Sequence, residues 1–522
     1  MHIEILSITS SSITYELCIN KIYDAPSIEV KIYKAEKLIQ TTNTTKIINT
    51  FYNLEKDSEY KIVAEFNSNQ LIKENIKTDF SKHTLDVRDF GAKGDGKQNA
   101  TPFIQAAINV APKNCRIIIP EGTYLINSLF LKSNIEFEIC KNANLIADTD
   151  KTNYPFFPDI VEDYNNNDFE YLGSWEGNPY KAYCSIINAI NVENVKIFGE
   201  GTINGQASFE NWWKDPKHKE NHIARPRLFF ANHTNNILIE GLKFTNSPSW
   251  TIHPLNSKNV KIINTKILNP EISPNTDGID PESCENLSII GVHFSLGDDC
   301  IAIKSGKIFI ANHKGLPSSK ITIRQCLMEN GHGAVTLGSE LACGIYDVLV
   351  EDCKFKNTDR GLRIKTRRGR GERAIIDNII FNKIKMDGVK IPFVINSYYF
   401  CDIDGHSNYV QTREKLPIDS RTPNIKSLTF SNIKAINCEI AVASIEGLSE
   451  KPIDKISFKN IEVNFKQEAK EAFVAMNDKA IPIKKRGFII ENVNQIEMNN
   501  IKISNYEGPK VLINGKENEE LF

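Results

Sequence analysis

A short apolar pattern that recurs in the second half of the chain constrains its fold more than any other feature. The unit apolar-x-apolar-x-x-apolar-x-apolar returns at starts roughly 23 to 40 residues apart, a period typical of stacked repeats. Each half of the unit alternates as a strand does, whereas helical repeats show a 3.6-residue period. Stacking predicts an all-β fold, a right-handed parallel β-helix. Clear copies of the unit are Ile237-Ile239-Leu242-Phe244, Leu287-Ile289-Val292-Phe294 and Val348-Val350-Cys353-Phe355.

The first part of the chain has a different pattern. Residues 1–83 hold short alternating runs separated by polar turns, which predicts a small β-sandwich. Leu54, followed by Tyr60 at the start of a strand, resembles the tyrosine corner of fibronectin type III domains. We therefore expect a fibronectin type III-like module over 1–83 and a β-helix over 84–522. The module is expected to be a spacer or lid.

The junction between the two parts is rich in glycine. Residues 89–96 read as a turn, and no strand-GxxxxGK[ST]-helix order indicates a phosphate loop. Pro102 fits the first turn of a helix capped by Thr101. A helix here is expected to cover the open end of the coil.

Composition excludes several function classes. Lys plus Arg total 63 and Asp plus Glu total 65, so a net charge of −2 gives no general field for nucleic acid or a membrane surface. No run of about 18 apolar residues predicts a membrane span. Eleven cysteines without a Cys-x-x-Cys pair favour reduced, buried thiols over zinc or disulfides. No leader-like segment opens the sequence, so a cytoplasmic location is expected. No cofactor or metal is predicted, and the oligomeric state is not indicated.

Four polar segments interrupt the repeat, each about one rung after the last. Stacked rungs lie about 4.8 Å apart, so these segments are expected to form a column on one face of the coil. The segments are Asn275-Thr276-Asp277, Gly297-Asp298-Asp299, Gly331-His332-Gly333 and Arg363-Ile364-Lys365.

Strand parity predicts which of these side chains face outward. If the apolar pairs Ile301 and Ile303, Val335 and Leu337, and Leu362 and Ile364 point inward, the alternation predicts an outward face for a set of five side chains. Asp277 and Asp299 have the other parity, but burying an unpaired carboxylate is costly, so a bend is expected to turn them out. The outward set is Asp280, Asp298, His332, Arg363 and Lys365.

Several carboxylates, a histidine and two cations on one face suit glycoside hydrolysis. One carboxylic acid protonates the leaving oxygen, and another carboxylate activates water or attacks the sugar. Crowded like charges raise one pKa and keep a proton available. Arg363 and Lys365 suit a uronate carboxylate, which an arginine binds in a two-pronged manner.

The four motifs, in this order and spacing, resemble the polygalacturonases of glycoside hydrolase family 28 over roughly residues 84–510. The resemblance implies metal-free hydrolysis of α-1,4-linked galacturonan with inversion. It implies that Asp298 is the general acid and that Asp277 and Asp299 hold and activate water. Adjacent rungs place carboxylates about 5 Å apart, a separation that is generally found in retaining enzymes. The resemblance implies inversion instead, and inversion is the expectation here.

The resemblance also assigns binding roles. It implies that His332 hydrogen-bonds near the acid and that Arg363 and Lys365 bind the substrate carboxylate. A tyrosine downstream often lines the family's groove, and Tyr398 is the best match, ahead of Tyr399.

Four further features bear on substrate binding. Asp280, in the outward set, is a candidate substrate contact. His253, predicted outward one rung before Asp277, is another candidate, and a role as a plain surface residue is equally favoured. The arginine-rich run 367–373 is expected to extend the carboxylate-binding surface, with a charged loop as the alternative. The segment 150–225 carries aromatic side chains that suit sugar stacking or packing: Tyr154, Phe156, Phe157, Tyr164, Tyr171, Trp175 and Trp212.

We therefore expect an exo-acting hydrolase of oligogalacturonides or pectin. The N-terminal module and the 150–225 insertions are expected to block one end of its groove. The alternatives are a rhamnogalacturonan or xylogalacturonan hydrolase, a calcium-dependent pectate lyase using the Asp cluster, and a non-enzymatic carbohydrate-binding β-helix.

Overall fold

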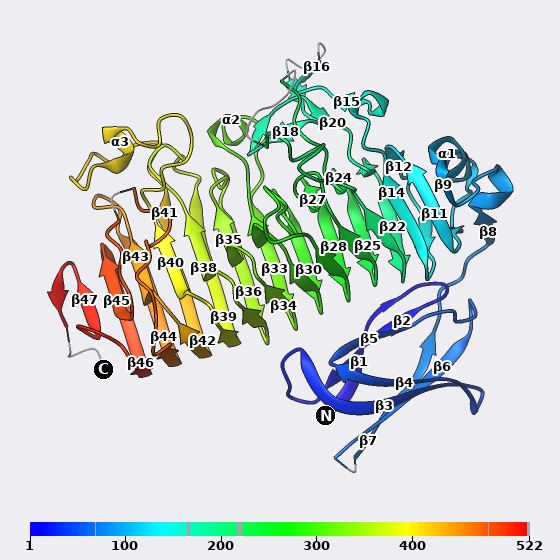
Figure 1. Cartoon of the computed structure of the whole chain (residues 1–522), viewed down its shortest axis with the longest axis horizontal. Helices are drawn as coiled ribbons and strands as arrows, with labels where there is room; N and C mark the ends of the chain where they lie inside the picture. Colours follow the sequence, from blue (N-terminus) through cyan, green and yellow to red (C-terminus); the bar gives the residue numbers. More distant parts are fainter. Residues whose placement is uncertain (68, 164–167, 217–221, 479, 519–522) are drawn as a thin grey trace.

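A computed structural model describes residues 1–67, 69–163, 168–216, 222–478 and 480–518 of the chain. It is a long coil of parallel strands with a smaller β-structure packed beneath one end (Figure 1). The predicted all-β fold, a parallel β-helix preceded by a small β-sandwich, is confirmed.

The N-terminal module consists of two antiparallel sheets. The Tyr60 hydroxyl accepts a hydrogen bond from the backbone N–H of Glu55 at 2.8 Å, as a tyrosine corner does. The likeness to fibronectin type III domains stays a prediction. One sheet is β1 (His2–Ile8), β2 (Ile13–Cys18) and β5 (Ile48–Phe51), and the other is β4 (Lys37–Lys46), β3 (Asp24–Lys34), β6 (Glu59–Phe66) and β7 (Asn69–Lys77).

A short helix covers the first rungs of the coil. Helix α1 (Thr101–Val110) buries Ile104, Ala107 and Ile108 against the coil's core. Its N-cap is Ala100, so the prediction that Thr101 caps the helix is wrong. Thr101 is the first helical residue, and its N–H donates to the Asn99 side chain at 3.0 Å. The expected end-capping helix is therefore present, with a different cap.

A parallel sheet of 23 strands forms two adjoining ladders of the coil, because most rungs contribute two strands and each pairs with its counterpart one rung away. Its inward residues stack on their counterparts one rung away, and the predicted repeat positions are buried. Burying each such aliphatic or phenylalanine side chain contributes about 1.5–3 kcal/mol. The strands are β8 (His83–Asp86), β9 (Asp95–Asn99), β10 (Cys115–Ile119), β11 (Gly122–Ile126), β13 (Ile135–Ile139), β14 (Ala143–Ala147), β22 (Glu193–Gly199), β23 (Thr202–Asn204), β25 (Asn235–Glu240), β26 (Lys243–Thr245), β28 (Lys258–Ile263), β29 (Lys266–Leu268), β30 (Glu285–Ile290), β31 (His293–Ser295), β33 (Ser318–Arg324), β34 (Leu327–Glu329), β36 (Ile345–Glu351), β37 (Lys354–Lys356), β39 (Ile375–Asp387), β41 (Asn424–Ile425), β42 (Ser427–Cys438), β44 (Ile453–Phe465) and β46 (Val493–Ser504).

Asparagines make the bends of this sheet. Asn432, Asn460 and Asn500 have φ of 55°, 55° and 54°, a left-handed conformation that asparagine tolerates better than most residues. Their amides form a ladder in which Asn500 donates to Asn460 and Asn460 donates to Asn432, both at 2.9 Å. The asparagine-rich turns of the sequence are thus the corners of the coil.

The opposite face of the coil is split into two parallel sheets. Between them, residues 279–282 make only isolated bridges to the rungs on either side, and Pro281 has no N–H to donate. The first sheet is β12 (Leu129–Phe130), β21 (Ile187–Ile190), β24 (Phe229–Asn232) and β27 (Ile252–Leu255). The second is β32 (Asp299–Ile303), β35 (Gly333–Gly338), β38 (Arg360–Lys365), β40 (Ile391–Asn396), β43 (Ala441–Glu446), β45 (Arg486–Glu491), β47 (Val511–Ile513) and β48 (Lys516–Glu517).

Loops rise above the split face, on the side away from the N-terminal module (Figure 1). They carry α2 (Ile308–Ala311), α3 (Asn408–Gln411) and three small antiparallel pairs: β15 (Phe156–Phe157) with β20 (Ala182–Tyr183), β16 (Val161–Asp163) with β17 (Asp168–Glu170), and β18 (Ser174–Trp175) with β19 (Asn178–Pro179). In the part of the chain described, none of the helices has the length and apolar character needed to cross a membrane.

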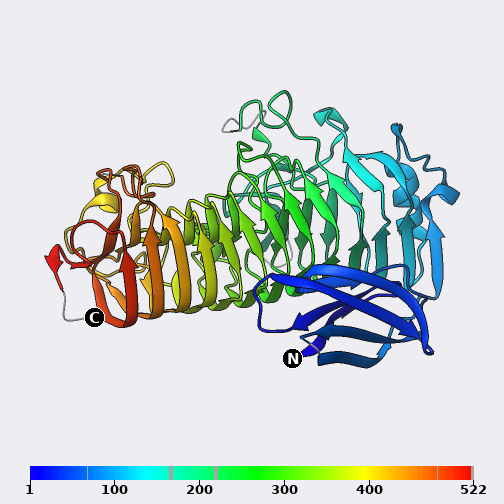
Figure 2. The same ribbon diagram turned by 60° about the horizontal axis from the view of Figure 1, so that its bottom comes forward.

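The N-terminal module lies along the 23-stranded sheet (Figure 2). Leu238, Ile263 and Ile290, from three successive rungs, belong to the module's own hydrophobic core. The Ser12 hydroxyl donates to Glu240 at 2.8 Å. These contacts lie on the face of the coil opposite the split sheets, so the expectation that the module blocks the groove is wrong.

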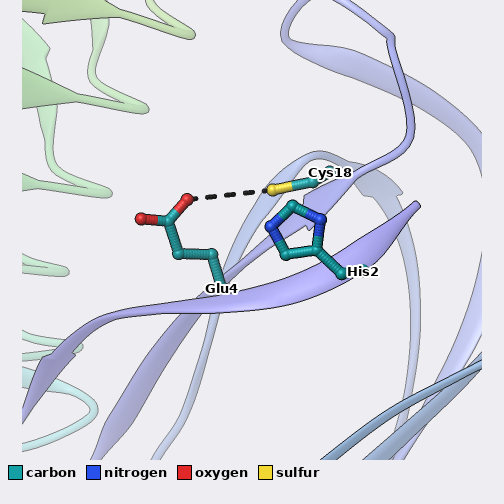
Figure 3. Close-up of side chains that lie close together, drawn as sticks. All are labelled: His2, Glu4 and Cys18. Carbon is teal, nitrogen blue, oxygen red and sulfur yellow. Dashed lines mark hydrogen bonds between the residues drawn. The ribbon is translucent and has the colours of Figure 1, made fainter.

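All eleven cysteines are free thiols, as predicted. Cys326 and Cys353 are fully buried in equivalent slots of adjacent rungs. Cys18 is half-buried in the N-terminal module, where its thiol donates to Glu4 at 3.9 Å beside His2 (Figure 3).

Candidate active site

A cavity of about 360 Å³ opens over the break in the split face. The polar segments predicted from the sequence meet here, because each comes at the start of one rung or on the strand that follows. Their predicted inward neighbours, Ile301, Val335 and Leu362, pair in register and are fully buried. The lining includes Asp277, Asp298, His332, Arg363 and Lys365.

Three carboxylates crowd the floor of this cavity. Asp277 and Asp298 line it, and Asp299 lies fully buried beside them. Oxygens of the three carboxylates lie within 4.8 Å of one another. Asp277 is turned toward the cavity despite its parity in the sequence, as expected from the cost of burying an unpaired carboxylate. The same expectation for Asp299 is wrong: its carboxylate stays buried, because Arg363 and Lys365 pair with it.

Two cations fix the charge of Asp299. Its Oδ1 lies 3.0 Å from Arg363 Nη1 and its Oδ2 lies 3.0 Å from Lys365 Nζ. Burial alone raises the pKa of Asp299, but Lys365 and Arg363 outweigh it and hold this pKa far below its usual range. Asp299 is therefore an ionised carboxylate at neutral pH.

Asp277 is in the opposite state. Burial, and then the neighbouring Asp298 and Asp280, raise the pKa of Asp277 well above its usual range. Adjacent carboxylates whose surroundings push their pKa values apart are the arrangement that supplies both an acid and a base. The cluster can hold a proton beside an ionised base.

His332 stands at the edge of the cavity with half of its side chain exposed. Its backbone N–H donates to the Asp298 carbonyl at 2.9 Å, and its Nδ1 lies 3.1 Å from Asp359 Oδ2. The hydrogen bond with Asp359 is the main cause that raises the pKa of His332. The side-chain partner of this histidine is thus Asp359, and only its backbone binds the predicted acid.

Sequence reasoning missed Asp359 and Lys304. Asp359 also lies 2.7 Å from Lys390 Nζ, and it precedes β38 as His332 precedes β35, a position that identifies it in retrospect. Lys304 Nζ, almost fully buried, lies 3.5 Å from Asp280 and 3.3 Å from Glu340. Lys304 directly follows the last residue of β32, the strand that begins beside Asp298.

Comparison with known proteins decides the family. The model for "Glycosyl hydrolases family 28" matches residues 115–477. A probable polygalacturonase of Vitis vinifera is 31% identical over 396 residues, which cover 74% of this chain and 76% of that protein. The chain belongs to glycoside hydrolase family 28. It is therefore a glycosidase, a hydrolase of the polygalacturonase family.

Solved structures agree with this assignment. A hyperthermoactive exopolygalacturonase from Thermotoga maritima is similar over 81% of this chain and 92% of its own, with 27% identity and a TM-score of 0.64. The family 28 exopolygalacturonase of Yersinia enterocolitica covers 98% of this chain and 97% of its own, with a TM-score of 0.72. Its identity of 19% makes that likeness one of fold alone.

Two predicted substrate contacts of this family 28 enzyme are buried. His253 is fully covered, with Nε2 3.0 Å from Glu282, and burial lowers the pKa of His253 to about 4. Asp280 is also fully covered, and burial raises the pKa of Asp280 to about 8. Both belong to the layer beneath the cavity, so their expected contact with substrate is corrected.

The tyrosine prediction is corrected as well. Tyr398 is fully buried, its ring faces the Arg413 guanidinium at 3.8 Å, and its hydroxyl lies 3.1 Å from Ser449. Tyr399 is the residue that lines the cavity. The alternation of β40 no longer applies beyond its last residue, Asn396, so parity does not select between the two tyrosines.

The arginine-rich run is structural rather than part of the cavity. Arg367 pairs with Asp404, Arg370 with Asp402 at 2.9 Å, and Arg368 with Glu450 at 2.6 Å. The Arg373 guanidinium donates to the backbone carbonyl of Gly315 at 2.7 Å. Internal acceptors engage these guanidinium groups, so the expected extension of the carboxylate-binding surface is wrong.

Two sets of loops wall the cavity. Trp175 and Glu176, from the β18–β19 turn, lie on one side, and Tyr399, Cys401 and Asp402 lie on the other. The turn is fixed in place, because the Lys307 N–H donates to the Gly177 carbonyl at 2.9 Å.

A side chain at position 177 has no room. A Cβ added at Gly177 falls 2.8 Å from the Glu340 side chain, and its φ of +72° disfavours other residues. Most of the aromatic side chains predicted in the insertion are buried, apart from half-exposed Phe156, while Tyr164 lies outside the described residues.

Proposed function

We propose that this enzyme hydrolyses α-1,4-galacturonosyl linkages of galacturonan or its oligosaccharides, from one end and with inversion. The observation that carries the proposal is the cavity in which an ionised Asp299 and a proton-retaining Asp277 flank Asp298, beside Arg363 and Lys365. No cofactor takes part in the proposed reaction.

The proposed acid is Asp298. It is half-buried at the cavity surface, whereas Asp299 is held below by its two cations. Burial and the neighbouring Asp298 raise the pKa of Asp277, so Asp277 retains a proton inside the cluster. Asp277 passes this proton to Asp298, and Asp298 delivers it to the leaving oxygen. The ionised Asp277 and Asp299 then hold the attacking water, and Asp277 accepts its proton.

The proposed uronate contacts are Arg363 and Lys365. Each keeps about a tenth of its side chain exposed, 12% and 11%, while the buried side engages Asp299. A substrate carboxylate that binds the exposed side receives charge-assisted hydrogen bonds. The hydrogen bond with Asp359 raises the pKa of His332, which favours its protonated form and so a further positive group at the cavity edge.

The walls support attack at a chain end. The β18–β19 turn is bonded to the loop of Lys307 and packs against Glu340, so it narrows the groove on one side of Asp298. An enzyme whose groove is closed on one side accepts a polymer end rather than an interior segment. The proposal therefore includes exo action.

The first experiment compares the wild type with Asp298→Asn on oligogalacturonides in the presence of EDTA. Reducing ends, ultraviolet absorbance and product length are followed together. We expect new reducing ends without absorbance, released from one end and abolished by the substitution. The matched control is Asp347→Asn, on the opposite sheet, where an exposed carboxylate accepts only from Asn378 at 2.7 Å in the part of the chain described.

Other outcomes contradict separate parts of the proposal. Absorbing products lost with EDTA mean a lyase, and random internal cleavage means endo action. Activity only on rhamnogalacturonan or xylogalacturonan means that this polymer, and not galacturonan, is the substrate. Proton NMR of the fresh product decides the stereochemistry: a β-anomer means inversion, and an α-anomer means retention, the outcome that carboxylates closer than about 5.5 Å generally accompany.

A further inference from the structure

Three metal-ligating side chains gather on the N-terminal module, outside the catalytic cavity. His2 and Glu4 are two positions apart on β1, so they face the same side of the strand. Cys18 of β2 lies directly opposite His2 in the antiparallel ladder and joins them on that side. Figure 3 shows the three side chains turned toward one another. A ring nitrogen of His2, a carboxylate oxygen of Glu4 and the Cys18 sulfur all lie within 4.8 Å of one another.

The spacing of these three donor atoms is close to what one metal ion requires. Zinc binds nitrogen, oxygen and sulfur at about 2.0–2.3 Å, which in a tetrahedral site places neighbouring donors about 3.3–3.7 Å apart. Glu4 Oε2 lies 3.9 Å from the Cys18 sulfur. Because His2 and Glu4 are exposed, rotation about their side-chain bonds can bring the donors closer, and an ion can enter from solvent.

The charges around the cluster favour a cation. Glu16 lies opposite Glu4 in the same ladder and adds a second carboxylate. Arg324, from β33 of the coil, pairs with Glu16, and its guanidinium lies 4.0 Å from Glu4 Oε2. One arginine offsets only one of the two carboxylates, so negative charge remains for a metal. Carboxylates that bind metals are commonly held by such a second partner.

The types of donor select the class of metal. A thiolate, an imidazole and a carboxylate form a mixed set that suits zinc, whereas calcium and magnesium take oxygen ligands. Burial, and then the nearby Glu16 and Glu4, raise the pKa of Cys18 to about 11. The thiol therefore holds its proton at neutral pH until a metal displaces it, and binding releases that proton. Water completes the fourth position of a tetrahedral site with three protein donors.

We propose that His2, Glu4 and Cys18 bind one zinc-type divalent cation, which ties the start of β1 to the end of β2. Strand β1 is the edge of the sheet β1-β2-β5, so within this sheet it is paired on one side only. The ion adds a cross-strand link at the pair that opens the ladder. No step of the proposed hydrolysis uses these residues, so this inference stands apart from the proposed function.

The test is a titration of the reduced full-length protein with cobalt(II), a spectroscopic substitute for zinc. The ultraviolet thiolate-to-cobalt absorption reports binding through sulfur, and added zinc should displace the cobalt. We expect one equivalent in the wild type and no such band in Cys18→Ser. His2→Gln and Glu4→Gln should each raise the Kd at least about tenfold. The matched controls are Cys140→Ser, another half-buried thiol, and Glu59→Gln, an exposed carboxylate of the module, and both should keep the wild-type Kd.

Hydrogen exchange tests the link between the strands. Zinc at about 100 times its Kd should slow the exchange of the β1 amides about a hundredfold in the wild type and leave Cys18→Ser unchanged. Thermal melting checks that each variant is folded, and His2→Gln tests the site without a change of the thiol.

Three results would overturn the site. The first is no thiolate band in the wild type, including the case in which cobalt binds through oxygen at Asp277, Asp298 and Asp299. The second is a band that persists in Cys18→Ser. The third is an unchanged Kd in both His2→Gln and Glu4→Gln, which would mean that the thiol binds the metal alone.

Discussion

The two faces of this coil are built from the same repeat, yet only one carries the site. On the far face, 23 strands run without interruption and asparagine ladders repeat at the corners. On the other face, residues 279–282 make isolated bridges to both neighbouring rungs, and Pro281 donates no backbone hydrogen bond. The carboxylates gather at this rung and the next. Regular stacking thus provides a rigid frame, and the site lies where the strand pairing is least regular.

Buried charge also differs between the two faces. Beside the site, Lys304 lies between Asp280 and Glu340 and is almost fully buried. On the far face, outside the area that the N-terminal module covers, pairs such as Lys455 with Glu497 are about half exposed. Removing water strengthens electrostatic effects, so a substitution in the buried group is expected to matter more than one in the half-exposed pair.

The largest expected effect is on catalysis. Asp299→Asn should lower kcat about a thousandfold, because it removes the ionised group beside the acid and leaves Arg363 and Lys365 without their anion. Steady-state kinetics on an oligogalacturonide measures this loss. The same change at Asp347 on the far face should leave kcat within twofold, and a large loss there would remove the distinction between the faces.

The next effect is on stability. Arg368→Met should lower the free energy of unfolding by about 3–5 kcal/mol, because it leaves Glu450 buried without its partner. Denaturant unfolding measures the change, and adding Glu450→Met should restore part of it. Lys455→Met, in a half-exposed pair of the far face, should cost less than about 1 kcal/mol. Equal losses in both variants would mean that burial does not distinguish these ion pairs.

A smaller effect is on pH dependence. Asp359 raises the pKa of His332, so the protonated histidine persists to higher pH in the folded enzyme than in the unfolded chain. The stabilisation that the His332–Asp359 bond gives is complete below the pKa of His332 in the unfolded chain. It is lost as the pH rises through the pKa of His332 in the folded enzyme. In Asp359→Asn, this loss should occur at lower pH. Facing charges are Asp298, Asp299, Arg360 and Lys390.

The measurement is an NMR titration of His332 together with the pH profile of kcat/KM. The profile should shift in the same direction as the histidine pKa, with a loss of about tenfold at the pH where only the wild type remains protonated. Asp359→Glu should restore part of both. An unchanged histidine titration in Asp359→Asn would contradict the role assigned to the bond.

The smallest effect is on a corner of the far face. Asn460→Ala should lower stability by about 1–2 kcal/mol, because alanine resists the left-handed backbone and interrupts the amide ladder. Asn460→Gly keeps the backbone conformation and should lose less. Thermal melting of the two variants measures the difference, and equal losses would assign the whole effect to the ladder.

Much of this architecture could be predicted from the sequence because the repeat is local. Apolar positions such as Ile237 and Phe244 recur at fixed offsets, and Asp298, His332 and Arg363 occupy the column that their spacing indicates. Parity also gave the correct face for the inward neighbours of these residues, as for Ile301 and Val335.

The errors arose where distant segments meet. His253 stands on the outward face of β27, next to its neighbour Phe230, but the insertion covers it. Arg368 has its acid, Glu450, 82 positions away, so the run of arginines looks solvent-exposed in sequence. The burial of a side chain and its ion pairs depend on contacts between segments that are distant in sequence, and a local sequence pattern does not predict these contacts.

The attachment of the N-terminal module has a mechanical consequence. It is joined to β25, β28 and β30 through Leu238, Ile263 and Ile290, the three rungs that neighbour β27 and the broken rung. A stacked coil bends by opening the gaps between rungs. Here the N-terminal module spans those gaps on the outer side of the coil, so it opposes bending at the rungs that neighbour Asp277.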